Sequence, residues 1–465
     1  MAVDCFRKAI ARKPHFAPAH NNLGCALRRL EKVDDAIAAY HQAIELNPNL
    51  ADAYNNLGCA LRKKDQQDEA LRNFRKAIEL KPDFADAYNN LAGALIENQP
   101  EEAAAAYRRA IEIKPDHVDA HCGLGSVLQA SGKFDEASIC YCEALRRKPD
   151  HAEAHLNNGF LLLTEGKLEE GWREYEWRLK SKICGIQSFK QPLWDGSPLE
   201  GRTLLVHAEQ GLGDTLHFIR YLPRVFERAC GTVRFETLPQ LIPLLKQSSY
   251  QGLIARGSPL PAFDVHVPLL SLPRIFGTTL TSIPNEVPYL SADSQLVQKW
   301  ADGLIAYDGL KVGVVWQGNP ENKGDRKRSI PLEHFAPLAQ VEGVRLFSLQ
   351  KGPGIEQLKD LSFPVIQFDE SIDTQSGPFM DTAAILKNFD LVISCDTAVA
   401  HLAAALGVST WVALQYLPDW RWMLDREDSP WYPTVRLFRQ TESGNWGNVF
   451  DRIAHELPNH VGASC

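Results

Sequence analysis

The chain has 465 residues, of which 45% are hydrophobic and 23% charged, and it carries a formal net charge of −8 at pH 7. This length is more than one ordinary core accommodates and predicts two or three domains. The negative net charge argues against nucleic acid as the main partner, and no apolar run reaches the ~20 residues that a membrane-spanning helix needs.

The ten cysteines and the N-terminus indicate the cellular compartment. The cysteines are scattered, without a CxxC pair or a Cys/His group at zinc spacing. We therefore expect buried free thiols, no metal site and a cytoplasmic protein. The first residues, MAVDCFRKAIARKP, resemble the second helix of a repeat and not a signal peptide, so we expect an incomplete first repeat.

A unit of about 34 residues repeats through the first third of the chain. The unit closes with a proline each time: Pro14, Pro48, Pro82, Pro115 and Pro149. After each proline stands a near copy of one phrase, for example APAHNNLG at 17–24 and ADAYNNLG at 51–58. This period and pattern resemble the tetratricopeptide repeat, a two-helix unit that stacks into a solenoid. We predict this α-solenoid over residues 1–180 and a turn-rich connector over 181–200, with Trp172 packing the solenoid end onto the next domain.

One position of the first helix carries asparagine four times, at Asn22, Asn56, Asn90 and Asn157, and Gly123 interrupts the series. First helices line the concave wall of such a solenoid, so the amides would form a ladder along an extended peptide backbone. The repeats look most like those of the eukaryotic protein O-linked N-acetylglucosamine transferases, whose ladder holds acceptor polypeptides. This resemblance implies a polypeptide acceptor or a protein partner. Alternatively, each Asn bonds a neighbouring helix within the stack.

The sequence after the connector alternates short apolar strands with helical stretches. A strand at 203–208 is followed by the turn Gly211-Leu212-Gly213-Asp214 and a helical pattern at 215–227, as at the opening of a nucleotide-binding α/β unit. A second series starts with a strand at 311–316. Further strands are expected at 233–236, 253–255, 265–267, 345–349, 391–394 and 410–414. We predict two Rossmann-like domains, at 201–300 and 301–465, that face each other across a cleft.

Three phrases occur in the order seen in heptosyltransferase-like glycosyltransferases: GLGD at 211–214, NPENKGDRKRSIP at 319–331 and DTAVAHLAAALG at 396–407. The resemblance covers about residues 201–457. The chain is also similar to a bacterial family that joins tetratricopeptide repeats to such a region, with EQGLGD, RSIP and DWRW phrases. These resemblances imply the two-domain GT-B fold and inverting transfer of a sugar from a nucleotide donor.

The candidate donor site combines a helix N-terminus with a basic loop. Asp396 and Thr397 precede a helix of small residues, whose free N–H groups suit a diphosphate. Because no Asp-x-Asp pair is present to hold a metal, basic side chains are expected to compensate the phosphate charge. These candidates are Lys323, Arg326, Lys327 and Arg328. By the resemblance, Arg328 is the basic residue beside the phosphates; a solvated basic loop is the alternative.

Other residues complete the expected donor site. The resemblance implies that His401, one turn after Thr397, bonds a phosphate or sugar oxygen. Ala398 stands where the family usually carries glycine, which leaves the donor open. We expect Gly211 and Gly213 of the turn to lie at this site too. Two further ligand contacts are predicted, Gln350 and Asp419.

Asp214 is the candidate general base. The resemblance gives the Asp of this GxGD turn the role of deprotonating the acceptor hydroxyl, and helix N-capping is the structural alternative. No cofactor is expected, since the nucleotide sugar is a substrate. The competing function is an adaptor, in which the repeats recruit a protein partner and the α/β part is a degenerate, non-catalytic sugar-nucleotide fold.

Overall fold

The computed structural model describes residues 2–462 except 182–186, 188 and 323. Contacts divide the chain into two compact units, Met1–Leu161 and Leu162–Cys465, which we call the first and second unit. The predicted fold class is confirmed: a solenoid of paired helices is followed by an α/β region with two parallel sheets. The domain bounds at 180, 200 and 300 stay predictions.

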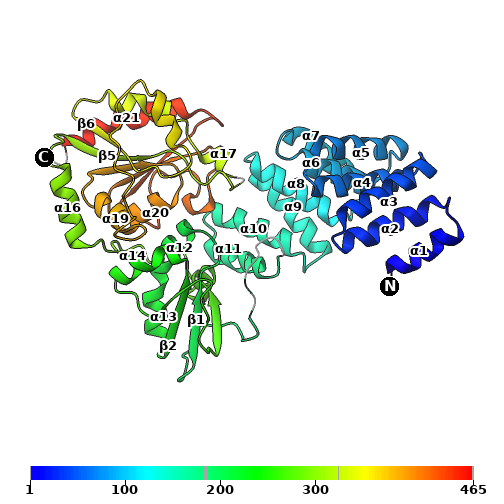
Figure 1. Ribbon diagram of the computed structural model, residues 1–465, viewed down its shortest axis with the longest axis horizontal. Helices are drawn as coiled ribbons and strands as arrows, with labels where there is room; N and C mark the ends of the chain where they lie inside the picture. Colours follow the sequence, from blue (N-terminus) through cyan, green and yellow to red (C-terminus); the bar gives the residue numbers. More distant parts are fainter. Residues whose placement is uncertain (1, 182–186, 188, 323, 463–465) are drawn as a thin grey trace. The chain divides into compact units, whose positions relative to one another are not determined.

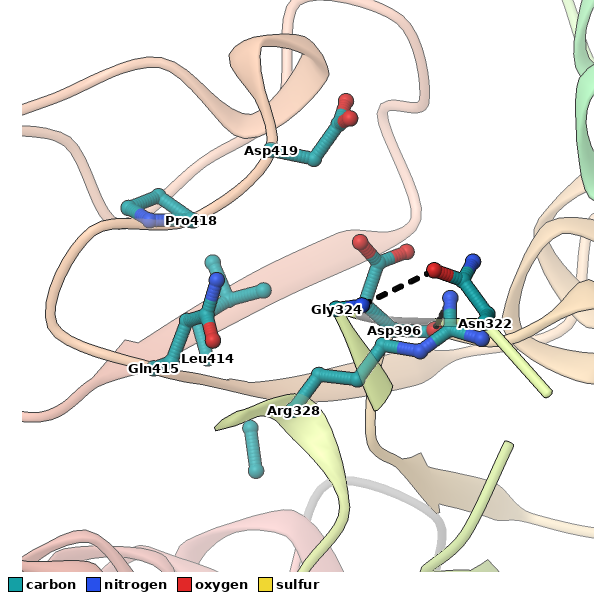
Figure 2. Close-up of a pocket in the computed structure, with 9 residues that line it drawn as sticks. Asn322, Gly324, Arg328, Asp396, Leu414, Gln415, Pro418 and Asp419 are labelled. Atoms are coloured by element: carbon teal, nitrogen blue, oxygen red, sulfur yellow. Dashed lines mark hydrogen bonds between the residues drawn. The ribbon is translucent and has the colours of Figure 1, made fainter. Parts of the chain in front are cut away.

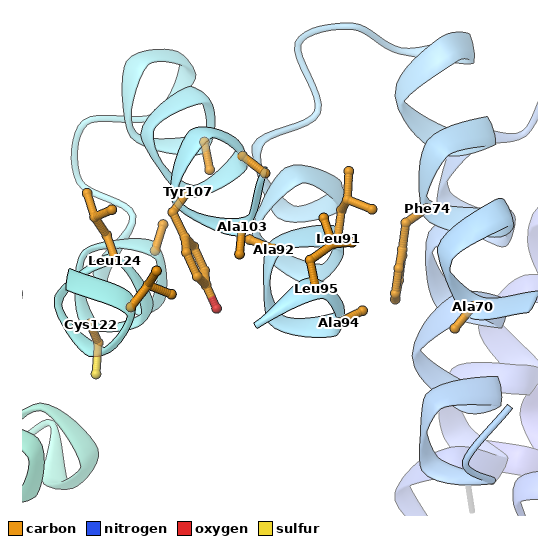
Figure 3. Close-up of a cluster of buried hydrophobic side chains, with 14 of the residues drawn as sticks. Ala70, Phe74, Leu91, Ala92, Ala94, Leu95, Ala103, Tyr107, Cys122 and Leu124 are labelled. Atoms are coloured by element: carbon orange, nitrogen blue, oxygen red, sulfur yellow. The ribbon is translucent and has the colours of Figure 1, made fainter. Parts of the chain in front are cut away.

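The first unit is a series of antiparallel helix pairs (Figure 1). Its helices are α1 Ala2–Arg12, α2 Ala17–Arg29, α3 Val33–Leu46, α4 Ala51–Lys63, α5 Gln67–Leu80, α6 Ala85–Leu95, α7 Pro100–Ile113, α8 Val118–Ala130 and α9 Phe134–Arg147, and α10 Ala152–Thr164 runs across the boundary. Apolar and small residues on facing sides of successive helices form one continuous buried cluster (Figure 3). Stacking neighbours therefore supplies the core that no single pair could form.

A glycine of the first helix and a ring of the second set the spacing within a pair. A Cβ on Gly58 would lie 2.6 Å from the ring of Phe74, so only glycine permits this approach. The third pair differs, because Ala92 holds the glycine position and Tyr107 (Figure 3) lies against Gly123 of the next repeat. A Cβ there would be 2.6 Å from the Tyr107 hydroxyl oxygen. This crowding explains why the asparagine series is interrupted at position 123.

The second unit begins with α11 Leu168–Tyr175 and η1 Glu176–Leu179, and continues with a four-stranded sheet that we call, with its helices, the first lobe. The strands are β1 Thr203–His207, β2 Thr232–Thr237, β3 Leu253–Ala255 and β4 Val265–Pro268, in the order β3-β2-β1-β4 and all parallel. The helices are α12 Leu212–Phe218, η2 Ile219–Tyr221, α13 Leu222–Ala229, η3 Pro239–Leu241, α14 Ile242–Gln247, η4 Leu269–Ser271 and α15 Leu272–Ile275.

The second lobe is built on a five-stranded parallel sheet. Its strands are β5 Leu310–Val315, β6 Val344–Ser348, β7 Leu391–Ser394, β8 Thr410–Leu414 and β9 Val435–Arg439, in the order β6-β5-β7-β8-β9. Its helices are α16 Ser294–Leu304, α17 Asp325–Arg328, η5 Leu332–Phe335, α18 Ala336–Ala339, η6 Ile355–Asp360, α19 Met380–Leu386, α20 Ala398–Ala405, η7 Trp420–Trp422 and α21 Trp446–Gly462. The inner strands β7 and β8 are wholly buried because helices cover both faces of the sheet. The chain order reverses between β5 and β7, where such sheets bind ligands.

Helix α11 packs into the second unit through aromatic and charged side chains. The Trp172 ring lies 5.2 Å from Trp420 and 6.3 Å from Phe218, between centroids. Arg178 of η1 is fully buried and forms a bidentate ion pair with Glu209, just after β1. Its Nε lies 2.9 Å from Oε2, and its Nη2 lies 2.8 Å from Oε1. Trp172 therefore packs against the α/β region, as the sequence predicts.

Candidate functional site

A cavity of about 180 Å³ opens at the carboxyl edge of the second sheet, near the point where the strand order reverses (Figure 2). Its lining residues are Asn322, Gly324, Arg328, Asp396, Ala413, Leu414, Gln415, Pro418 and Asp419. Sites that hold a whole drug-sized ligand usually measure about 300–1,000 Å³. This cavity can therefore enclose only one part of a ligand as large as a nucleotide sugar.

Arg328 is held at the cavity by two hydrogen bonds. Its Nε donates to Oδ1 of the buried Asp325 at 3.0 Å, and its Nη1 donates to the carbonyl oxygen of Asp396 at 2.9 Å. Gly318, just beyond β5, makes this possible, because a Cβ there would lie 2.5 Å from Nη2 of Arg328 and even closer to Asp325. Sequence reasoning missed Gly318; its place directly after a strand end was the available signal.

Asp396 follows β7 and also lines the cavity, with its side chain 17% exposed. Burial and the neighbouring Asp419 carboxylate raise the pKa of Asp396 to about 6, against the opposing effect of the Arg328 guanidinium. The ring Nε2 of His401 lies 3.7 Å from Oδ1 of Asp396. The structure thus brings together four of the predicted donor-site residues at one edge of the sheet.

His401 shares a tyrosine hydroxyl with a second buried histidine. The Nδ1 atoms of His401 and His217 each lie 3.0 Å from the hydroxyl of Tyr432. Burial lowers the pKa of both imidazoles well below the ordinary value, and the Arg421 and Arg220 guanidiniums lower it further. Because one hydroxyl donates only one proton, at most one of the two Nδ1 atoms accepts from it, and at least one of the rings carries its proton on Nδ1. Nε2 of His217 has no hydrogen-bond partner among the described residues.

Thr397 is the N-cap of α20 and lies against the first lobe. Its hydroxyl pairs with that of Ser394 at 3.1 Å and does not cap the helix. The turn of α12 packs on this end, since a Cβ on Gly213 would lie 3.2 Å from Cδ2 of His401 and 3.6 Å from Cα of Ala398. Gly213 therefore serves close packing between the lobes, and a diphosphate contact at Thr397 stays a prediction.

Asp214 accepts hydrogen bonds on both carboxylate oxygens. It is the third residue of α12, whose N-cap is Gly211 and not Asp214, and its Oδ2 accepts from the Gly211 N–H at 3.0 Å. Its Oδ1 accepts from Nη2 of Arg421. The same guanidinium binds Oδ1 of Asp419 through Nη1 at 2.8 Å. Arg421 thus connects Asp214 to Asp419, which lines the cavity. Sequence reasoning did not single out Arg421.

Two further predicted donor contacts, Gln350 and Arg326, do not line the cavity. The Gln350 amide is buried and binds the loop after β5: its Oε1 accepts from the N–H groups of Trp316 and Gln317, and its Nε2 donates to two carbonyls. Arg326 is exposed. Lys323 lies outside the described residues. We therefore leave Gln350 out of the proposed site.

The asparagine series makes contacts between consecutive repeats. Nδ2 of Asn56 donates to Oδ1 of Asn21 at 3.0 Å, and Nδ2 of Asn90 donates to Oδ1 of Asn55 at 2.9 Å. Asn157 follows the same pattern with the sulfur of Cys122, at 3.7 Å. Asn22 is exposed. These bonds agree with the alternative that each Asn bonds a neighbouring helix within the stack. They use Nδ2, so the Oδ1 atoms of Asn56, Asn90 and Asn157 are the groups that would bind a peptide.

Comparison with known proteins identifies the repeats. Family models of the tetratricopeptide repeat match residues 17–50, 51–84 and 118–151, and a TPR repeat model matches 95–132, so the predicted repeats are confirmed. Protein FlbA of Caulobacter vibrioides is 29% identical over 314 residues, 62% of this chain and 52% of FlbA. The chain thus spans about half the length of that relative.

Solved repeat structures resemble part of the chain. YrrB, described as a TPR protein with an unusual peptide-binding site, is 26% identical with a TM-score of 0.32, over 39% of this chain and 94% of its own. MamA is 25% identical with a TM-score of 0.30, over 34% of this chain and 93% of MamA. None of these names states an enzymatic activity. Among the described residues, no helix is long and apolar enough to cross a membrane.

Proposed function

We propose that this protein is a metal-independent, inverting glycosyltransferase that uses a nucleoside diphosphate sugar. The observation that carries the proposal is the cavity at the strand-order reversal of the second sheet, lined by Arg328, Asp396 and Asp419. The repeats, which are of a protein-interaction type, would present the acceptor, which we take to be a polypeptide.

The proposed reaction uses few protein groups. Asp214 takes the proton of the acceptor hydroxyl, and the freed electron pair attacks the anomeric carbon of the sugar. The bond from that carbon to the diphosphate breaks with inversion, and the nucleoside diphosphate leaves with the bonding electrons. Arg328 and the amides at the start of α20 stabilise its charge.

The charge of the site sets a condition on donor binding. Arg328 and Arg421 are outnumbered by the carboxylates of Asp214, Asp396 and Asp419, and Asp325 adds one more. A diphosphate would add further negative charge, so its affinity must draw on the exposed side chains of Arg326 and Lys327, which precede Arg328. Donor affinity is therefore expected to fall with rising salt concentration.

An adaptor is the second candidate function. Two observations favour it: family models of a protein-interaction repeat match the first part of the chain, and the Asp214 carboxylate already accepts a hydrogen bond on each oxygen. In this case the repeats bind a protein partner and the α/β region turns over no donor.

Incubation with a panel of nucleotide sugars separates the two candidates. For the enzyme we expect nucleotide release, which Asp214→Asn reduces by about 10²–10⁴-fold while donor binding is retained; Arg328→Ala weakens binding itself. Asp428→Asn is the matched control, because Asp428 is a 72% exposed carboxylate in an Arg–Asp pair outside the cavity. If no donor of the panel gives release or a thermal shift, the adaptor is the correct function.

A further inference from the structure

One guanidinium joins carboxylates from the two lobes. Arg421 of η7 donates from Nη2 to Asp214 of the first lobe and from Nη1 to Asp419, which lines the cavity of the second lobe. Asp214 and Arg421 are 207 residues apart in sequence. The side chain of Arg421 is 8% exposed, so this contact is shielded from solvent.

The Arg421 guanidinium is confined in both position and charge. It lies 4.3 Å from the ring centroid of Trp420 and 5.5 Å from that of Phe218. Its backbone N–H also donates to Oδ1 of Asp419, at 3.0 Å, so the turn of η7 closes on the same carboxylate. Burial alone would lower the pKa of Arg421, but the carboxylates of Asp419 and Asp214 raise this pKa above its ordinary value. Arg421 is therefore a fixed cation.

We propose that Arg421 is a positioning residue for sugar transfer: it fixes the Asp214 carboxylate beside the donor cavity. The inference rests on the proposed function. With Oδ2 bound to the Gly211 N–H and Oδ1 to Arg421, the Asp214 carboxylate cannot rotate. Its remaining lone pairs are left for the acceptor hydroxyl. Arg421 itself gains and loses no proton during the reaction.

Loss of the guanidinium affects both lobes at once. The carboxylates of Asp214 and Asp419 then lose their shared counter-ion, so the first can rotate and the two no longer have a common anchor. A displacement of about 1 Å at a reacting group can cost about 10²-fold in rate. Lysine keeps the charge, but its single ammonium cannot reproduce the planar fork that reaches two carboxylates.

The test compares Arg421→Gln, Arg421→Lys and the control Arg426→Gln in the full-length protein. Arg426 lies five positions later and forms an Arg–Asp pair of the same kind with Asp428, on a side chain 27% exposed. We measure kcat for nucleotide release with the most active donor, together with the stoichiometry of nucleoside diphosphate binding by calorimetry. We expect Arg421→Gln to lower kcat by about 10–100-fold at unchanged stoichiometry. Arg421→Lys should recover part of the loss, and Arg426→Gln should match the wild type.

Each result decides a different question. If the wild type releases nucleotide and Arg421→Gln keeps kcat within twofold, the positioning role is wrong and the proposed function stands. If kcat and binding stoichiometry fall by the same factor, Arg421 only supports the fold and the inference is again overturned. If Arg421→Gln does not fold, Asp419→Asn replaces it and should lower kcat at unchanged stoichiometry. If the wild type turns over no donor, the proposed function fails first.

Discussion

Gly318 offers the sharpest test of how the cavity is built. Substitution by alanine places a Cβ 2.5 Å from Nη2 of Arg328 and even closer to Oδ1 of Asp325. Neither neighbour moves freely, because Arg328 is bonded to Asp325 and to the carbonyl of Asp396. Gly318 does not have a positive φ, so alanine fits its backbone conformation. The substitution therefore tests only the contact of the new Cβ with Arg328 and Asp325.

The expected cost follows from the bonds that must break. Displacing Arg328 forfeits at least one charge-assisted hydrogen bond, worth about 1.5–3 kcal/mol. Alanine also reduces the conformational entropy of the unfolded chain, which stabilises the folded state by about 0.4–1 kcal/mol. The net loss of unfolding free energy is therefore about 1–2 kcal/mol, a fall of a few degrees in unfolding temperature. Binding of a nucleoside diphosphate should weaken by about 10–100-fold, since one charge-assisted bond to phosphate is worth a similar energy.

Thermal unfolding and calorimetric titration with a nucleoside diphosphate measure the two effects. Gly303→Ala in α16 is the control, because a Cβ there meets nothing within 4 Å and alanine favours the helix. If the clash displaces Arg328, Gly318→Ala and Arg328→Ala lower the affinity by the same route, and the double variant loses no more than either alone. Additive losses, or wild-type stability in Gly318→Ala, would refute the reasoning.

Three further predictions concern the repeats, the joint at η1 and the pH dependence of stability. Arg178→Met leaves the buried Glu209 unpaired and should cost about 3–5 kcal/mol, seen as a large drop in the unfolding temperature of the second unit; an unchanged temperature contradicts it. Gly123→Asn should cost about 1–3 kcal/mol by overpacking against Tyr107, and a Tyr107→Ala background should remove most of that loss in urea unfolding. Because the pKa of Asp396 is raised from 3.8 to about 6, its contribution to stability falls as the pH rises between these values. Asp396→Asn should remove this component from the pH dependence of the unfolding temperature, and identical curves for both proteins would count against it.

Local patterns explain how much of the fold the sequence predicted. The repeats were predictable because their period and small residues recur within each copy, and the strands because apolar runs end at turn residues. The expected strand at 391–394 coincides with β7 Leu391–Ser394, and the one at 203–208 lies within one residue of β1 Thr203–His207. Strand β9 escaped prediction, since two arginines interrupt the apolar residues of Val435–Arg439.

The contacts of the candidate site could not be read from the sequence in the same way. Asp214 and Arg421 are separated by 207 residues, and no local pattern records that one will reach the other. The histidine pair at Tyr432 likewise depends on packing between the lobes. The sequence did predict that Asp396, Arg328 and Asp419 would lie at one site, because each belongs to a segment that follows a strand of the same sheet.

The burial of α11 in the core of the second unit has a consequence for the evolution of such proteins. Helix α11 continues the repeat series in sequence, yet its Trp172 and the following Arg178 fill the interior of the α/β lobes. Helix α11 must therefore be inherited together with those lobes, although its sequence belongs to the repeat series. A fragment that begins at residue 201 lacks a part of its own core, since Trp172 and Arg178 precede it.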